Sequence, residues 1–376
     1  WMIQRRWLVL SLSILVFAIG FTGLRYFKVS ASWEDYFLED DPMLVKTEEF
    51  KDIFGNDNFA AVLTRCDNLF TKENLQLIRE LTNEMMDSLS YADKITSLTD
   101  IEFMVGSEEG MTIEQIVPET IPSDPAQLEE IRHKAYLKPH VAERLVSKDG
   151  TLSWIILKLR TFPEDSVWNK GKNAVAPEVL TGNELEHIIT KDKYQKLHPK
   201  GTGLPYVTAM KMKWISKEMP RVLGIATLIS ILILLLVTRS FRGVVVPLVT
   251  AVGSIIIVYG MLGYVGMTID SGMVMIPMLL TFAVSIAYNI HVYSYFKRQF
   301  LMHGKRTQAV EETVREMGWP VLFSALTTFA ALLSFLAIPM QPMRFIGIAT
   351  SSCVMLAFFI AITLMPVLLS FGKDGK

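Results

Sequence analysis

Six long apolar stretches constrain this chain more than any other feature of its sequence. An α-helix needs about 20 apolar residues to cross a bilayer. The chain has 51% hydrophobic residues and a mean hydropathy of +0.33, which makes it more apolar than an ordinary soluble domain. We therefore predict an α-helical membrane bundle of six transmembrane helices. They lie at about 7–26, 220–238, 244–265, 273–296, 319–338 and 345–371.

The first stretch has a second interpretation as a cleaved signal peptide. Its length, and the lack of a small-residue cleavage site after it, favour a retained helix. The chain then divides into a first helix at 1–27, a domain at 28–218 and a five-helix bundle at 219–376. Because the chain begins with Trp1 rather than Met, we expect the natural protein to be longer.

Lysine and arginine residues gather at one set of helix ends. Positive charge favours the cytoplasmic side of a membrane, although Arg221 and Arg344 fall at the opposite ends. We expect the spans in a bacterial inner membrane, both termini in the cytoplasm, and the domain at 28–218 in the periplasm. The basic residues are Arg5, Arg6, Arg239, Arg242, Lys297, Arg298, Lys305, Arg306, Lys373 and Lys376.

The domain at 28–218 alternates strand-like and helix-like segments. Their order predicts an α+β domain of the ferredoxin-like type. A proline-rich insertion at about 101–150, with a helix at 126–136, interrupts it. We expect strands at 59–65, 94–98, 152–160 and 206–208, and helices at 72–88 and 181–196.

Three residues are candidate helix N-caps. Thr71 precedes the helix at 72–88, and Thr307 lies near the start of a charged cytoplasmic helix expected at about 304–317. Asp270 stands at the start of the fourth span. A helix cap is the favoured role for this carboxylate, and a proton-relay acid is the alternative.

The sequence carries no motif for enzymatic chemistry. It has no G-x-S-x-G, no H-E-x-x-H and no Walker loop, and its histidines lack metal-ligand spacing. Cys66 and Cys353 cannot form a disulfide framework, and the net charge of −1 gives no bulk attraction to nucleic acid. We therefore predict no enzyme activity, cofactor, metal ion or nucleic-acid partner.

Polar residues interrupt the fourth span, in the segment SIAYNIHVYSYF at 285–296. Polar groups inside a bilayer are costly and mark a pathway or a partner. At about 100° per residue, Tyr288 shares a helix face with Ser285, while Asn289 and His291 flank it. Packing against a hydroxyl of the next helix is one role open to His291. Proton carriage is the other, since histidine titrates near neutral pH.

The fifth span contains three hydroxyl residues within about one turn, Ser324, Thr327 and Thr328. Small hydroxyl residues commonly hold membrane helices together. The alternative is that they face the fourth helix and are partners for Asn289 or His291.

Several segments together resemble one half of a resistance-nodulation-division (RND) transporter, closest to the MMPL-like branch that exports hydrophobic molecules. They are SWEDYFLEDDP, DNLFTKENLQLIRELT, GTGLPYVTAMKMKWISKEMPRV, TRSFRGVVVPL, YNIHVYSYF and GKRTQAVEETVREMGWPVLFSALTTFAALLSF. The resemblance implies a porter-type outer domain that passes lipids or other hydrophobic cargo. It also implies a second half, in the same polypeptide or in a homodimer, and proton flow through charged residues at the centre of the bundle.

The fourth span departs from this family pattern. Members commonly have Asp-Tyr followed closely by Ile-His, and here Ala287 stands where the aspartate is expected, one turn from His291. A buried aspartate can exchange a proton because burial raises its pKa, whereas alanine cannot. We expect a transporter of lipids or other hydrophobic molecules. The partners expected for it are a second half and a periplasmic protein. The alternative is a non-pumping lipid sensor or scaffold that acts with a partner complex.

Overall fold

The chain forms two compact units in a computed structural model that describes residues 2–30, 36–38, 40–54, 58–107, 110–142, 144–163 and 175–374. Unit 1 comprises Trp1–Leu44 and Ile215–Lys376, and unit 2 comprises Val45–Trp214. The acidic segment SWEDYFLEDDP at 32–42 lies partly outside the described residues. Each unit is described by itself.

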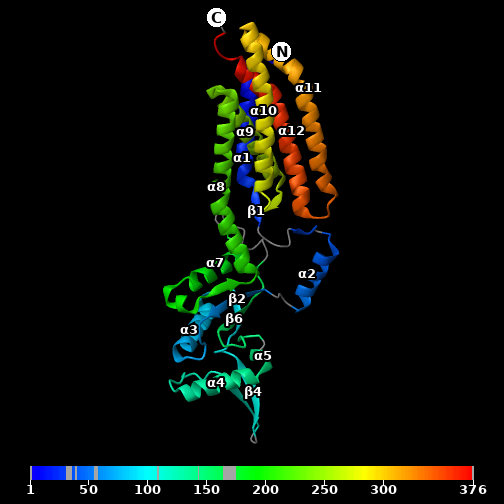
Figure 1. The fold of residues 1–376 in the computed structure, drawn as a ribbon. Coiled ribbons are helices and arrows are strands. Elements are labelled where there is room, and N and C mark those ends of the chain that lie inside the picture. The colour runs from blue at the N-terminus through cyan, green and yellow to red at the C-terminus, as the bar shows by residue number, and fades with distance from the viewer. Residues whose placement is uncertain are drawn as a thin grey trace. The chain divides into compact units, whose positions relative to one another are not determined.

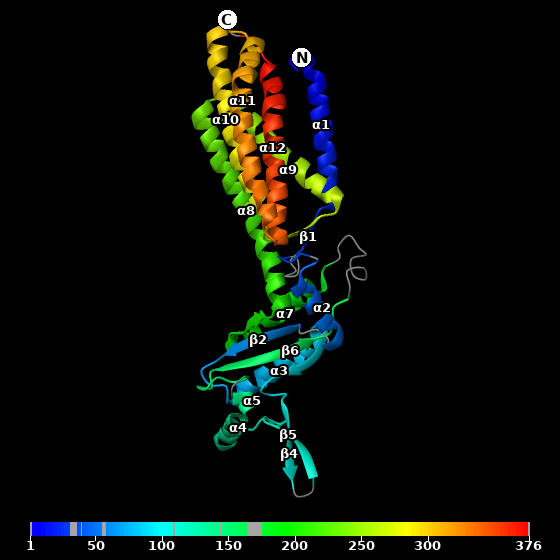
Figure 2. The same ribbon diagram turned by 90° about the vertical axis from the view of Figure 1, so that its right-hand side faces the viewer.

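Unit 1 contains helices that are long and apolar enough to cross a membrane (Figures 1 and 2). Within the described residues there are six of them, which confirms the predicted number. The second span begins earlier than expected, because α8 starts at Leu204 and carries Pro220 in its interior; only its part from Ile215 belongs to unit 1. The spans are α1 (Arg6–Gly23), α8 (Leu204–Thr238), α9 (Phe241–Val265), α10 (Met275–His303), α11 (Arg306–Leu333) and α12 (Gln341–Ser370).

Helices α9 and α12 form the centre of the bundle. In each of them 61% of the most apolar window is buried, against 11% in α1 and 17% in α11. Glycines let α1 approach α9 closely: a Cβ added at Gly260 would lie 1.9 Å from the carbonyl oxygen of Gly20. A Cβ added at Gly23 would lie 2.2 Å from the carbonyl oxygen of Gly260. Small residues at such crossings are how membrane helices gain close packing.

Two local expectations in unit 1 were wrong. The charged helix expected at about 304–317 is present from Arg306 and continues without a break into the fifth span as α11, but its N-cap is Lys305 rather than Thr307. Asp270 does not cap the fourth span, since α10 begins at Met275 with Val274 before it. Instead Asp270 ends the short strand β8 (Thr268–Asp270), which pairs in parallel with β1 (Lys28–Ser30).

Unit 2 contains a four-stranded antiparallel sheet in the order β3-β6-β2-β7. Helix α3 (Lys72–Ser88) connects β2 to β3, and α7 (Pro177–Ile189) followed by the 3₁₀ turn η3 (Asp192–Leu197) leads from β6 to β7. Thr71 caps α3 as predicted, because its hydroxyl accepts the N–H of Asn74 at 3.3 Å. The strands are β2 (Phe59–Arg65), β3 (Ala92–Thr96), β6 (Leu152–Leu159) and β7 (Lys200–Thr202).

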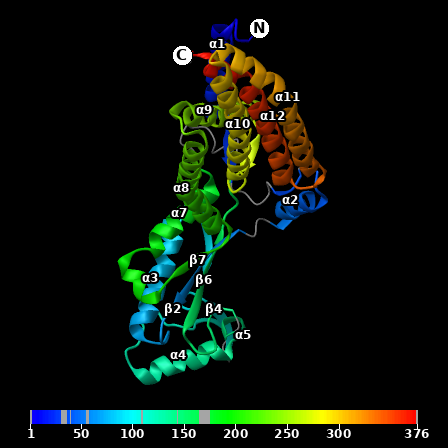
Figure 3. The same ribbon diagram turned by 45° about the horizontal axis from the view of Figure 1, so that its top comes forward.

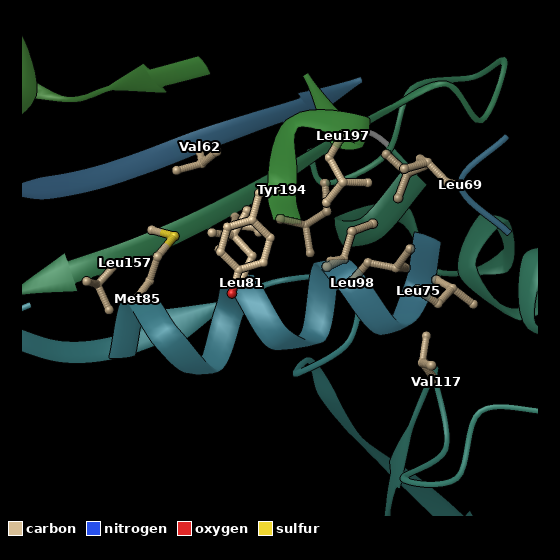
Figure 4. Packing of buried hydrophobic residues seen from close by; sticks show 14 of the residues in the cluster. Val62, Leu69, Leu75, Leu81, Met85, Leu98, Val117, Leu157, Tyr194 and Leu197 are labelled. Carbon is tan, nitrogen blue, oxygen red and sulfur yellow. The ribbon is translucent and has the colours of Figure 1, made fainter. Parts of the chain in front are cut away.

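One continuous core holds the sheet and its helices together (Figure 4). Apolar residues of β6 are buried at alternate positions, as a strand with one covered face requires. On α3, buried residues recur every three or four positions and meet that face. The labelled residues of this core include Val62, Leu75, Leu81, Met85, Leu157, Tyr194 and Leu197.

The last strand and the insertion differ from the sequence expectation. Residues 206–208 belong to α8, and the edge strand lies earlier, at Lys200–Thr202. The insertion contains the expected helix, as α4 (Pro125–Leu137), with the short α5 (Pro139–Ala142) after it. It also contains a hairpin that was not expected, formed by β4 (Glu102–Ser107) and β5 (Gly110–Gln115). Between β1 and β2 lies α2 (Pro42–Phe54).

Candidate functional site

Helix α10 presents its polar residues in different directions. It packs against α9, α11 and α12 (Figure 3). Ser285 and Asn289 are fully buried and Tyr288 is nearly so, whereas Ala287 and His291 are exposed. The three polar residues singled out in the sequence therefore do not form one cluster.

Asn289 is the centre of a hydrogen-bonded group between α9 and α10. Its Nδ2 donates to the Thr250 hydroxyl of α9 at 2.8 Å and to the Ser285 carbonyl at 2.7 Å. The Thr250 hydroxyl donates in turn to the Pro247 carbonyl at 2.8 Å. The other polar atom of the amide, Oδ1, is buried without a hydrogen-bond partner among the described residues. A buried polar atom without a hydrogen bond is energetically costly in a membrane span. The Nδ2 side of the amide is therefore hydrogen-bonded, and the Oδ1 side is unsatisfied.

Tyr288 points away from this group. Its ring belongs to the apolar cluster that includes Val321 and Ala325 of α11. Its hydroxyl has the Ser324 and Thr328 hydroxyls as polar neighbours. Among the described residues none has ordinary hydrogen-bond geometry to it. The Tyr288 hydroxyl is thus a second buried polar group of α10 whose hydrogen bonding is incomplete.

The hydroxyl residues of the fifth span do not bond to Asn289 or His291. Ser324 and Thr327 are exposed and Thr328 is half-buried. The Thr328 hydroxyl donates to the Ser324 carbonyl at 2.9 Å, and the Thr327 hydroxyl to carbonyls of its own helix at 3.0 Å. The partner of Asn289 comes from α9 instead.

His291 lies on an exposed stripe of α10. Ala283, Ala287, His291 and Ser294 are exposed at spacings of four, four and three residues, which is one face of a helix. A histidine on the outer face of a membrane span is expensive against lipid. The stripe is therefore a surface that suits protein better than hydrocarbon.

Several buried hydroxyl residues of unit 1 were missed in the sequence. Thr250 and Ser254 of α9, Thr281 of α10 and Thr350 of α12 are all fully buried. The Ser254 hydroxyl donates to the Thr250 carbonyl at 2.8 Å. A signal was present, since Thr250 and Ser254, like Thr281 and Ser285, lie one turn apart. Each is a common residue in an apolar helix, so spacing alone could not single them out.

The buried group can hold hydrogen bonds but carries no acid. The sequence has no Asp or Glu between Asp270 and Glu311, nor between Glu316 and Asp374. Amides and hydroxyls do not titrate near neutral pH, while histidine does. The one histidine of segment 285–296, His291, lies outside the buried group, on the exposed stripe.

Comparison with known proteins agrees with this architecture. The sequence profile of the MMPL family matches residues 43–373. A relative from Methanocaldococcus jannaschii, named "Putative membrane protein MJ1562", is 20% identical over 376 aligned residues, covering 97% of this chain and 90% of the relative. The match to the family profile takes in most of both units, and the chain belongs to the MMPL family.

Proposed function

We propose that this chain is an RND-like transporter, or one half of one, that moves lipids or other hydrophobic molecules from the cytoplasmic membrane toward its outer side. The observation that carries the proposal is the MMPL match over residues 43–373. Six apolar helices and a separate α+β unit are the parts that such a transporter requires.

The proposed sidedness follows from charge. The basic residues lie where α8 ends and α9 begins, and again where α10 ends and α11 begins. Under the positive-inside tendency this end belongs in the cytoplasm. Unit 2 then lies on the outer side, which in a bacterium with two membranes is the periplasm.

Unit 2 is proposed to be a ferredoxin-like porter domain that takes up the cargo. Its sheet order, β3-β6-β2-β7, is that of two interleaved strand–helix–strand units. The first unit is β2, α3 and β3, and the second is β6, α7 and β7. This topology supports the assignment, and the hairpin and helices at 102–142 are an addition to it.

A second half, or a second copy of the chain, is the proposed cover for the exposed stripe of α10. The support is energetic: His291 and Ser294 are polar, and Ala283 and Ala287 are small enough for a close helix approach. Ion coupling, if it passes through this half, then requires either His291 or an acidic group that the second half supplies.

The alternative function is a lipid sensor or scaffold that does not pump. The observation that favours it is the lack of any Asp or Glu in α10. A bundle of this kind would keep the fold of a transporter, and a partner complex would move the lipid. The two functions differ in whether lipid distribution depends on the protein.

Deletion of the gene in its native host tests the proposal. Lipids of the cytoplasmic membrane and of the outer cell layers would be quantified by mass spectrometry. The transporter predicts that at least one lipid class accumulates severalfold in the cytoplasmic membrane and that the full natural gene reverses this. An unchanged distribution contradicts transport and favours the sensor or scaffold.

A further inference from the structure

Four cationic side chains surround one pocket at the basic end of unit 1. The pocket has a volume of about 250 Å³ and is lined by Arg239, Arg242, Lys297 and Arg306. These residues come from the α8–α9 connection, α9, α10 and α11. Four segments distant in sequence thus bring positive charge to one place.

Three of the cations are held in position by carbonyl groups at helix ends. Such bonds fix the side chains but leave their charge uncompensated, because a carbonyl oxygen carries only a partial charge. Among the described residues, the Arg239 guanidinium bonds to no carbonyl. The bonds are Lys297 Nζ to Thr238 O at 3.0 Å, Arg306 Nη1 to Leu369 O at 3.2 Å, and Arg242 Nη1 to Phe371 O.

Negative charge near the pocket is scarce. The Asp374 carboxylate accepts the backbone N–H of Arg306 at 2.9 Å, and it is the one carboxylate that the described residues place against this group. Four cations and one carboxylate leave a net charge of +3. Like charges this close repel each other. An anion in the pocket would therefore lower the electrostatic repulsion among the four cations.

The start of α9 adds to the preference for an anion. Ser240 is its N-cap and lines the pocket, but its side chain makes no capping hydrogen bond. The first backbone N–H groups of a helix are unpaired within the helix and carry partial positive charge. Helix N-termini with adjacent arginines are common phosphate sites.

Apolar side chains beside the pocket favour a lipid over a soluble anion. Phe300 and Leu301 line it. Leu301 is 76% exposed, and Phe241, next to Ser240, is 80% exposed. These residues stand at the end of the spans, where head groups meet acyl chains. Basic pockets between membrane helices are a recurring way to bind anionic head groups.

We propose that this pocket binds the phosphate group of an anionic phospholipid, with its acyl chains against Phe241 and Leu301. Arg239 and Arg242 contact the phosphate, and Lys297 contributes charge. This site is independent of the transport proposal, since it concerns a resident lipid at the helix ends and not the cargo.

Native mass spectrometry of the full chain in detergent tests the site. Equal amounts of phosphatidylglycerol and phosphatidylcholine would be added, and retention of each compared. We expect phosphatidylglycerol to be preferred, and Arg239→Gln to weaken its binding about fivefold, the effect of one basic charge near an anionic lipid. Arg298→Gln is the matched control, because Arg298 is exposed near the same end of α10 and does not line the pocket.

Two further measurements complete the test. The first distinguishes a lipid phosphate from free phosphate, and the second is a charge-conserving variant that controls for misfolding. Inorganic phosphate at millimolar concentration should not displace the lipid, and displacement would assign the site to a soluble anion. Lys297→Arg keeps the charge and should retain the preference. Equal retention of the two lipids by the wild type, or equal losses in Arg239→Gln and Arg298→Gln, would overturn the proposal.

Discussion

The Asn289 amide donates a hydrogen bond to the Thr250 hydroxyl across the α9–α10 interface, 2.8 Å away, and both side chains are fully buried. Ala287, the position at which the sequence resemblance leads us to expect an acid, lies on the exposed face of the same helix. The buried face holds a neutral amide instead. The hydrogen-bonded Asn289 amide and the His291 side chain therefore lie on different sides of α10.

The Asn289–Thr250 bond should contribute to stability through coupling between the two residues. The variants Asn289→Ala and Thr250→Ala and the double variant form a double-mutant cycle for the free energy of unfolding. We expect a coupling free energy of about 0.6 kcal/mol, and not above about 1.7 kcal/mol. Unfolding of the protein in mixed micelles measures it. Thr327→Ala is the control, because that exposed hydroxyl bonds only to its own helix. A coupling of zero would mean that the bond is not formed in the membrane.

The α1–α9 crossing should be intolerant of side chains. Gly260→Val places atoms where the Gly20 backbone lies, and we expect a loss of about 1–3 kcal/mol from overpacking. Thermal unfolding in detergent, with cross-linking between α1 and α9, reports it. Gly224→Val is the matched control, since a Cβ there meets nothing within 4 Å. Equal effects of the two substitutions would refute the close crossing.

Unit 2 should lose stability in acid through Glu84. Burial alone would raise its pKa, but hydrogen bonds from Lys191, Lys193 and Tyr194 lower the pKa to about 2. A depressed carboxyl pKa stabilises the fold above the ordinary value of 4.5, and this contribution is lost as the pH falls from there toward about 2.

Glu84→Gln should therefore lower the unfolding temperature at pH 7, and its difference from the wild type should shrink as the pH drops below about 4.5. Near-UV circular dichroism of the full chain measures both. Glu73→Gln should have little effect at either pH, because the Glu73–Lys196 ion pair is largely exposed. A difference between Glu84→Gln and wild type that is independent of pH would contradict the assignment.

The sequence predicted the elements whose pattern is strong. The spans follow from length and apolarity, and the strand at 152–160 from its alternation. The three-residue strand Lys200–Thr202 was missed, because it has no apolar pattern and joins the sheet edge through backbone bonds to β2. The hairpin at 102–115 was hidden in the segment interpreted as an insertion.

The candidate site was less predictable for a physical reason. A soluble helix shows its buried face by its apolar residues, whereas a membrane helix such as α10 is largely apolar all round. The sequence therefore placed polar residues at Asn289 and His291 without indicating that one is buried and the other exposed. It also gave no reason to pair Asn289 with Thr250, 39 residues away.

Oxygen accessibility of a nitroxide at position 287 decides whether this bundle is half of a larger transporter. Ala287→Cys in the natural protein would be spin-labelled in lipid, and Ile229→Cys would be the lipid-facing reference, as Ile229 is 51% exposed on α8. If a second half or a second copy covers the stripe of Ala287 and His291, the label at 287 should be markedly less accessible to oxygen than the label at 229. Equal accessibility at the two positions would show that the stripe faces lipid and would contradict the proposed assembly.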